Sequence, residues 1–321
     1  MCPSCQALVH SATLKTLADR AATARAAGDL TGALTAWRQA LELLPTGTRQ
    51  HEAVAANIEA LSRELDAPGT QAGRSETRSR IAKGTAGIGA LGLLLSKFKF
   101  ALFFLLAKGK LLLLGLTKAG TLLSMVLSFS VYWTLWGWRF ALGFVASIYV
   151  HEMGHVAALS RLGIEATAPM FIPGIGAVVR LKQYPVSPRE NARVGLAGPI
   201  WGLGAALACY GVFRATGSQT WGAIAQVGAW VNLFNLVPVW QLDGARGFHA
   251  LTHSQRWIAV AVLGAMWLLT TEGMLVLLLM TAAFSAWRGP APTEEDRRAL
   301  LEYCGLVIAL SLLTRIPVRT S

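Results

Sequence analysis

Two histidines and a glutamate lie close together inside an apolar stretch of this 321-residue chain, as His151-Glu152-Met153-Gly154-His155. In a helix, residues four apart share one face, so both imidazoles would reach one Zn²⁺ ion. Glu152 would stand beside them, placed to hold and deprotonate a water molecule. Burying such groups in a membrane is costly, which makes them a functional hypothesis by default. The alternative is that both histidines pack as neutral rings between helices while Glu152 is protonated.

A catalytic zinc ion needs a third protein ligand and leaves a fourth position for water. Asp243 is the only carboxylate in the next long apolar region. Two expected membrane crossings separate it from His155, so both would approach the same side of the membrane. The sequence therefore predicts His151, His155 and Asp243 as zinc ligands. The alternative role for Asp243 is to cap a helix that begins at Gly244.

Two other groups of residues could also bind a metal. His249 and His253 are four apart, but they lie in a polar stretch without an intervening glutamate, which favours a solvated interfacial helix. Cys2 and Cys5, with His10 nearby, resemble half of a structural zinc site. A complete site needs four ligands and the chain has no second C-x-x-C pair, so an inert terminus is the alternative.

The composition places these residues in a membrane. The chain is 54% hydrophobic and only 14% charged, whereas about 25% of a soluble domain is charged. Disorder, a small disulfide scaffold and an ordinary cytosolic enzyme are thereby excluded. The net charge of +12 comes from basic residues that punctuate apolar runs without forming a stripe, so we interpret it as the positive-inside bias of a membrane protein. We expect a multi-pass protein of the cell membrane, in contact with the lipid bilayer and with no nucleic-acid partner.

The elements that must position the motif follow from apolar runs near the length of about 20 residues that a membrane crossing requires. Clear crossings are predicted at 121–136, 138–159, 194–213 and 221–239. The run at 257–287 is either one tilted helix or two short ones, and 305–313 is too short to cross alone. The connection after the second crossing is rich in arginine and lysine, which places it in the cytoplasm together with the N-terminal part.

The remaining parts are expected to be soluble or interfacial. Small and aromatic residues fall at the offsets of a tetratricopeptide repeat, namely Gly28, Ala33, Trp37, Ala40 and Pro45. A plain helical hairpin is the alternative, and 51–65 would add one more helix. We expect five segments: a cytoplasmic tetratricopeptide-like module at 1–67, a linker at 68–83, a basic amphipathic interfacial segment at 84–118, the intramembrane zinc-site core at 119–256, and C-terminal membrane helices with a tail at 257–321.

A Pro-Gly turn flanked by apolar and β-branched residues at 169–180 predicts a β-hairpin between the second and third crossings. Such an edge could pair with an extended substrate strand. The alternative is a simple connector on the surface.

The motif H-E-x-x-H at 151–155, followed by N-x-x-P-x-x-x-L-D-G at 235–244, resembles the site-2 protease family of intramembrane zinc metalloproteases. The resemblance covers roughly residues 121–253. It implies an all-α multi-pass fold with a short membrane-dipping β-hairpin loop, here joined to a small soluble α-helical repeat-like domain. It implies regulated cleavage of the transmembrane segments of membrane-protein substrates, with Zn²⁺ as cofactor and Glu152 as catalytic base and acid.

The same resemblance assigns Asn235 to stabilising the oxyanion, for which a carboxamide is chemically suited. An interhelical hydrogen bond is the alternative role for Asn235. Three departures from the family pattern stand out: Leu236 replaces a common proline, Ala245 replaces a second glycine, and Gly202 replaces the asparagine of the family's G-P-x-x-N segment. None of them removes a predicted ligand.

Two rival functions fit parts of the pattern. One is another membrane zincin with a glutamate as third ligand, which is disfavoured because Glu165 and Glu190 lie outside apolar helices. The other is a non-catalytic zinc-stapled membrane scaffold that uses the helical repeat module to bind a protein partner. Glu152 argues against the scaffold, because a purely structural site needs no base.

Overall fold

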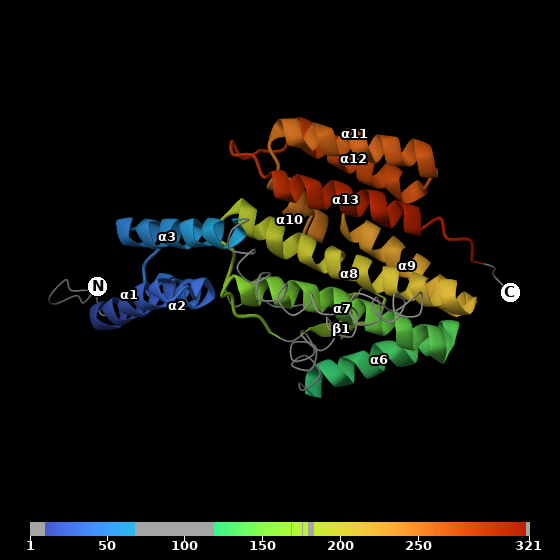
Figure 1. The fold of residues 1–321 in the computed structure, drawn as a ribbon, viewed down its shortest axis with the longest axis horizontal. Helices are drawn as coiled ribbons and strands as arrows, with labels where there is room; N and C mark the ends of the chain where they lie inside the picture. Colours follow the sequence, from blue (N-terminus) through green and yellow to red (C-terminus); the bar gives the residue numbers. More distant parts are fainter. Residues whose placement is uncertain (1–9, 68–118, 168, 175, 179–182, 319–321) are drawn as a thin grey trace, which may run out of the picture. The chain divides into compact units, whose positions relative to one another are not determined.

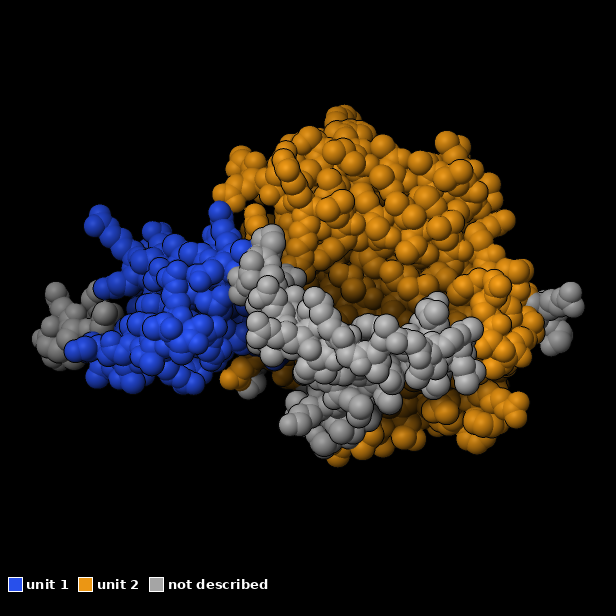
Figure 2. Space-filling view, in the orientation of Figure 1, with its two compact units in different colours: residues 1–111, 160–164 blue, residues 112–159, 165–321 orange. Residues whose placement is uncertain are grey.

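The computed structural model describes residues 10–67, 119–167, 169–174, 176–178 and 183–318. They form two compact units, of which one takes residues 1–111 and 160–164 and the other residues 112–159 and 165–321 (Figure 2). The expected linker and amphipathic segment at 68–118 lie outside the described residues, as do Cys2 and Cys5.

In its described residues the first unit contains the helices α1 (Ser11–Ala26), α2 (Leu30–Glu42) and α3 (Arg49–Asp66). Gly28, at φ +75°, makes the left-handed turn between α1 and α2. The carboxylate of Asp29 then accepts from Gly32 N and caps α2. Small side chains bury the face of α2, with Ala33, Ala36 and Ala40 almost fully covered. The structure therefore has helices in this part of the chain, as the sequence predicted, and their assignment to a tetratricopeptide repeat stays a prediction.

Residues 160–164 belong to this first unit. The hydroxyl of Thr31 donates to Arg161 O at 3.2 Å, and Arg38 Nε donates to Leu162 O at 2.9 Å. The guanidinium of Arg161 in turn donates to Leu65 O. The carbonyls of Arg161 and Leu162 lie at the C-terminal end of a helix, where the last carbonyls have no backbone donor. Side chains of α2 donate to them instead.

The second unit holds eight helices in the described residues, which Figure 1 labels. They are α6 (Ala119–Trp136), α7 (Trp138–Arg161), α8 (Pro188–Thr216), α9 (Gln219–Asn235), α10 (Asp243–His249), α11 (His253–Thr270), α12 (Gly273–Arg288) and α13 (Arg297–Leu313). Within the described ranges, α6, α7 and α8 are long and apolar enough to cross a membrane. The expected class, a mostly helical membrane protein, is therefore confirmed.

Two details of the C-terminal region were open or differ from the sequence analysis. The run at 257–287 forms two helices, α11 and α12, because Thr271 adopts a left-handed conformation at φ 52°. Helix α13 is 17 residues long although only 305–313 is apolar. It begins earlier because the Asp296 carboxylate accepts from Ala299 N, which caps a polar first turn.

A short antiparallel hairpin joins α7 and α8, with β1 (Met170–Ile172) paired to β2 (Gly176–Val178) in the register Phe171↔Ala177. Side chains of α6 hold its backbone: Thr121 donates to Pro169 O, while Ser124 and Tyr132 accept from Phe171 N and Gly174 N. The Phe171 side chain is buried, and those of Met170 and Ile172 are exposed. That this hairpin dips into the membrane stays a prediction.

Helix α7 contacts α8 and α6 in different ways. Towards α8 it is so close that a Cβ added at Gly154 would lie 2.4 Å from Ala197 O. Towards α6 the contact is made by rings, with Tyr132 and Phe144 centroids 5.2 Å apart. Tyr149 of α7 stacks on Phe171 of the hairpin at 6.3 Å.

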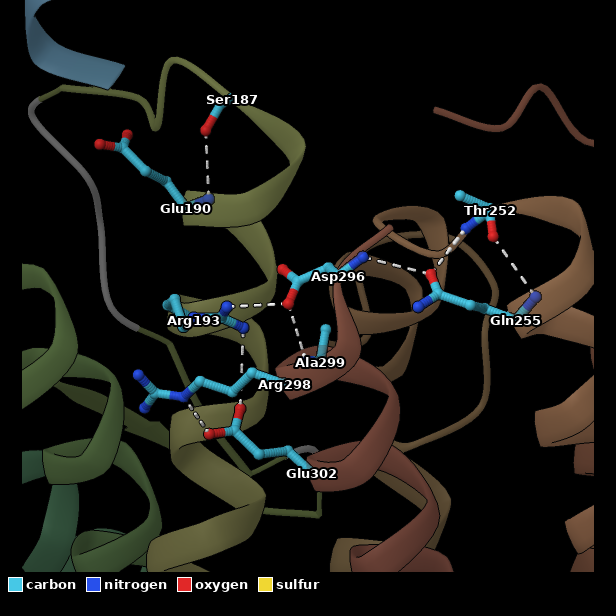
Figure 3. A network of polar contacts seen from close by, with 9 residues as sticks. All are labelled: Ser187, Glu190, Arg193, Thr252, Gln255, Asp296, Arg298, Ala299 and Glu302. Atoms are coloured by element: carbon cyan, nitrogen blue, oxygen red, sulfur yellow. Dashed lines mark hydrogen bonds and ion pairs between the residues drawn. The ribbon is translucent and has the colours of Figure 1, made fainter. Parts of the chain in front are cut away.

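A buried polar network fixes α8 against α11 and α13 (Figure 3). Arg193 of α8 pairs with Asp296 at 2.9 Å, and both side chains are buried. Gln255 accepts from Asp296 N and from Thr252 N, and so ties in the start of α11. A buried ion pair is tolerated only with good geometry and further hydrogen bonds, and Ala299 N donates one to the Asp296 carboxylate. The network therefore sets the position of the α8 segment that begins at residue 193.

Candidate metal centre

The side chains of His151, His155 and Asp243 converge on one point in the second unit. The Nε2 atoms of the two histidines are 3.2 Å apart. One carboxylate oxygen, Asp243 Oδ2, lies 3.1 Å from His151 Nε2 and 3.3 Å from His155 Nε2. A tetrahedral Zn²⁺ ion with bonds of about 2.0 to 2.1 Å keeps its ligand atoms roughly 3.4 Å apart. The three donor atoms therefore already have the separations that such an ion requires.

Helix α7 supplies both histidines because it continues without a break through the motif, and it buries His151, Glu152 and His155. Asp243 reaches them because α10 begins at this residue. Leu242 occupies the N-cap position without a side-chain hydrogen bond, so Asp243 does not cap the helix. The chain folds back sharply before α10: a Cβ added at Gly244 would lie 1.9 Å from Leu236 O. Only glycine fits at that point.

The second nitrogen of each imidazole has its own partner. His155 Nδ1 donates to the backbone oxygen of Val194 at 2.8 Å. His151 Nδ1 lies 2.8 Å from Oδ1 of Asn232. Metal-binding histidines usually donate their other N–H to a carbonyl or carboxylate, which fixes the ring and leaves Nε2 free for the ion. Sequence reasoning missed Asn232; the available signal was a second asparagine in an apolar helix, three residues before Asn235.

Two predicted catalytic residues differ in how the structure places them. Glu152 is buried, 7% exposed, and lies within electrostatic range of both histidines and Asp243. Asn235 is the last residue of α9 and is partly buried. Among the described residues, no polar contact links it to the three converging side chains. Its catalytic role stays a proposal.

His249 and His253 do not share a helix face. His249 ends α10 and His253 begins α11, because Thr252 caps a new helix between them. His253 Nδ1 lies 3.1 Å from Ala286 O. Burial and the nearby Arg256 guanidinium lower the pKa of His249. Within the part of the chain that the structure describes, the group with metal-binding geometry comprises only His151, His155 and Asp243.

On the side opposite α7, the site is bordered by Gly198 of α8. A Cβ added at Gly198 of α8 would lie 2.2 Å from His155 Nε2 and 2.7 Å from His151 Nε2. A side chain here would stand against the two nitrogen atoms that the ion needs. The site therefore requires a residue without a side chain at position 198. The residues present fit the Zn²⁺ ion that the sequence implies.

We expect Gly198→Ala to lower zinc affinity by at least about tenfold, since a metal site tolerates deviations of only about 0.2 Å in ligand distance. Competition with a chromophoric chelator on the detergent-purified full chain measures this. Gly204→Ala is the matched control, because it lies in the same helix with no atom within 4 Å of the added Cβ. Equal zinc affinity in both variants would show that residue 198 does not border the ion.

Comparison with known proteins agrees with this chemistry. Residues 139–220 match the model of Peptidase family M50. This range contains the two histidines and Glu152, and it ends before Asp243. A segment of 71 residues, 20% of this chain, is 35% identical to "Probable zinc metalloprotease EGY2, chloroplastic" of Arabidopsis thaliana. The matched segment spans 13% of that protein. No solved structure matches. The matches support a membrane metalloprotease.

Proposed function

We propose that this protein is an intramembrane zinc metalloendopeptidase that cleaves transmembrane segments of membrane-protein substrates. The observation that carries the proposal is the convergence of His151, His155 and Asp243 within 3.1 to 3.3 Å, with Glu152 beside them in a helix long enough to cross the membrane. The match to Peptidase family M50 over the segment that holds the H-E-x-x-H motif supports it.

In this mechanism His151, His155 and Asp243 would hold the zinc. When bound there, Zn²⁺ would polarise the scissile carbonyl and make water a competent nucleophile near neutral pH. Glu152 takes the proton from the attacking water and delivers it to the leaving amine, since a carboxylate within reach serves as base and then as acid. Asn235 would donate its amide to the developing oxyanion.

A substrate helix must unwind before it is cut, because its amides are internally paired. The hairpin β1–β2 is suited to receive the unwound strand, and the stack of Phe171 on Tyr149 ties it to α7 two residues before His151. The edge of β1 that faces α6 is already occupied, since Phe171 N donates to the Ser124 hydroxyl of that helix. We therefore place the substrate strand alongside β2.

The proposed setting is the cell membrane, with the N-terminal unit in the cytoplasm, where it recruits a protein partner. The concentration of arginine and lysine in the connection that contains the hairpin supports this orientation. The alternative, a zinc-stapled scaffold without catalysis, shares the metal site and differs in the role of Glu152.

The proposal is tested on the full chain reconstituted in liposomes. The probe is a panel of single-span peptides, each carrying a fluorophore, a quencher and a helix-breaking Asn-Pro pair at a different depth. We expect cleavage that 1,10-phenanthroline stops and added Zn²⁺ restores, because the base has no activated water without the ion. Cleavage that survives complete removal of zinc, or a full panel without zinc-dependent cleavage, contradicts the proposal.

A further inference from the structure

Asn232 is a polar side chain buried in the middle of the second unit, with only 3% of its surface exposed. It lies on the inner face of α9, which packs along α8. Its amide nitrogen Nδ2 donates to Gly228 O at 2.7 Å, one turn back in the same helix. Its oxygen Oδ1 lies 2.8 Å from His151 Nδ1.

These two contacts fix the direction of the hydrogen bond to the histidine. A carbonyl such as Gly228 O can only accept, so the Asn232 atom that faces it must be the NH₂ group. The remaining amide atom is an acceptor, and His151 Nδ1 must therefore carry the proton that it accepts. The other ring nitrogen, Nε2, is then unprotonated and directs its lone pair towards His155 and Asp243.

The space for Asn232 is provided by α8. A Cβ added at Gly202 would lie 2.0 Å from Asn232 Oδ1 and 2.6 Å from its Nδ2. Any side chain at 202 would push the amide away from the ring. This gives a physical reason for the departure at Gly202: the place next to the site is filled by an amide from another helix.

The two histidines are held in different ways. His155 donates to the backbone oxygen of Val194, a group that no substitution at 194 removes. His151 depends on a side chain and on the glycine that accommodates it. A change at Asn232 or Gly202 should therefore act on His151 and leave the contact of His155 in place.

We propose that Asn232 is a positioning residue that fixes the tautomer and ring orientation of His151 for cation binding, and that Gly202 is required because it leaves room for this amide. The inference rests on the metal site of the proposed function, and it concerns zinc affinity rather than proteolysis. Partners of this kind typically contribute 10- to 100-fold to metal affinity.

The test measures Zn²⁺ affinity by chelator competition, and the absorption spectrum of bound Co²⁺, on the purified full chain. We expect Asn232→Leu to weaken Zn²⁺ binding by about 10- to 100-fold and to alter the Co²⁺ spectrum. Asn232→Asp keeps an acceptor oxygen for His151 Nδ1 but loses the amide donor to Gly228 O, so it should recover only part of the affinity. Gln226→Leu is the matched control, because it removes a half-buried amide from the same helix. Gln226 donates to Thr314 O at 2.8 Å, and its loss should leave the Zn²⁺ affinity and the Co²⁺ spectrum unchanged.

A second pair of variants approaches the same contact from α8 and serves if Asn232→Leu does not fold. Gly202→Ala should weaken Zn²⁺ binding and shift the Co²⁺ spectrum in the same direction as Asn232→Leu. Gly204→Ala, with open space around its Cβ, should do neither.

Folded Asn232→Leu or Gly202→Ala protein with unchanged Zn²⁺ affinity and Co²⁺ spectrum overturns the inference, as does an equal loss in Gln226→Leu. If zinc binds as expected but no peptide is cleaved, the proposed function fails and the inference about Asn232 stands. If neither histidine binds zinc in the unaltered protein, both fail.

Discussion

Glu152→Gln is expected to lower the rate of peptide cleavage by roughly 10²- to 10⁴-fold, the usual contribution of a general acid and base. Glutamine has nearly the same shape but cannot take a proton from water. Zinc binding should persist, because the three converging donor atoms belong to other residues. The buried site should also keep its fold, since a neutral amide costs less to bury than a carboxylate. Initial rates in liposomes and zinc content of the same preparation measure the two effects.

The matched control is Glu272→Gln, the same chemical change at the turn between α11 and α12, where the glutamate side chain makes no cap hydrogen bond. It should cleave at the rate of the unaltered protein. Glu152→Gln distinguishes the protease from the scaffold, because both bind zinc and only the protease loses function. Undiminished cleavage in Glu152→Gln would remove the base from the mechanism.

Asp243→Ala is expected to lower zinc affinity by more than the 10- to 100-fold that a supporting hydrogen-bond partner contributes, because it deletes one of three ligands. Cleavage should be lost together with the metal. The fold should survive, since the Asp243 carboxylate does not cap α10. Zinc content after dialysis and the thermal midpoint in detergent separate loss of metal from loss of structure.

Glu295→Ala controls for removal of an acidic side chain, because Glu295 is 55% exposed and lies outside the site. Its zinc content and thermal midpoint should match those of the unaltered protein. Comparable zinc in Asp243→Ala and in the control would leave the two histidines without a third ligand. The protease proposal would then lose its central support.

The position of His151 and His155 on one helix face could be predicted because it depends only on local periodicity, which four-residue spacing fixes. Asp243 required a further step, the count of crossings that returns the chain to the same side. The structure brings these three side chains together, and their role as ligands stays a proposal. The sequence left open whether 257–287 is one tilted helix or two short ones, and the structure has two, because Thr271 ends α11.

Other features depend on packing between helices and have no short-range signal. Asn232 contacts His151 across 81 positions of sequence, and only the approach of α9 to α7 creates that pair. The spacing of His249 and His253 suggested one helix, but Thr252 starts a new one between them. The length of α13 was missed because a capped, charged first turn carries no apolar pattern.

The different contacts that α7 makes with α6 and with α8 bear on where a substrate of the proposed protease would enter. Where α7 meets α8, Gly154 faces the backbone oxygen of Ala197 and Gly198 borders both histidines, so moving α8 would disturb the candidate metal site. On the α6 side, the contact is made by aromatic rings and by the hairpin, and not by the candidate ligand residues. For the proposed protease we therefore expect a membrane-embedded substrate to enter between α6 and α7, with α8 as the fixed side of the site.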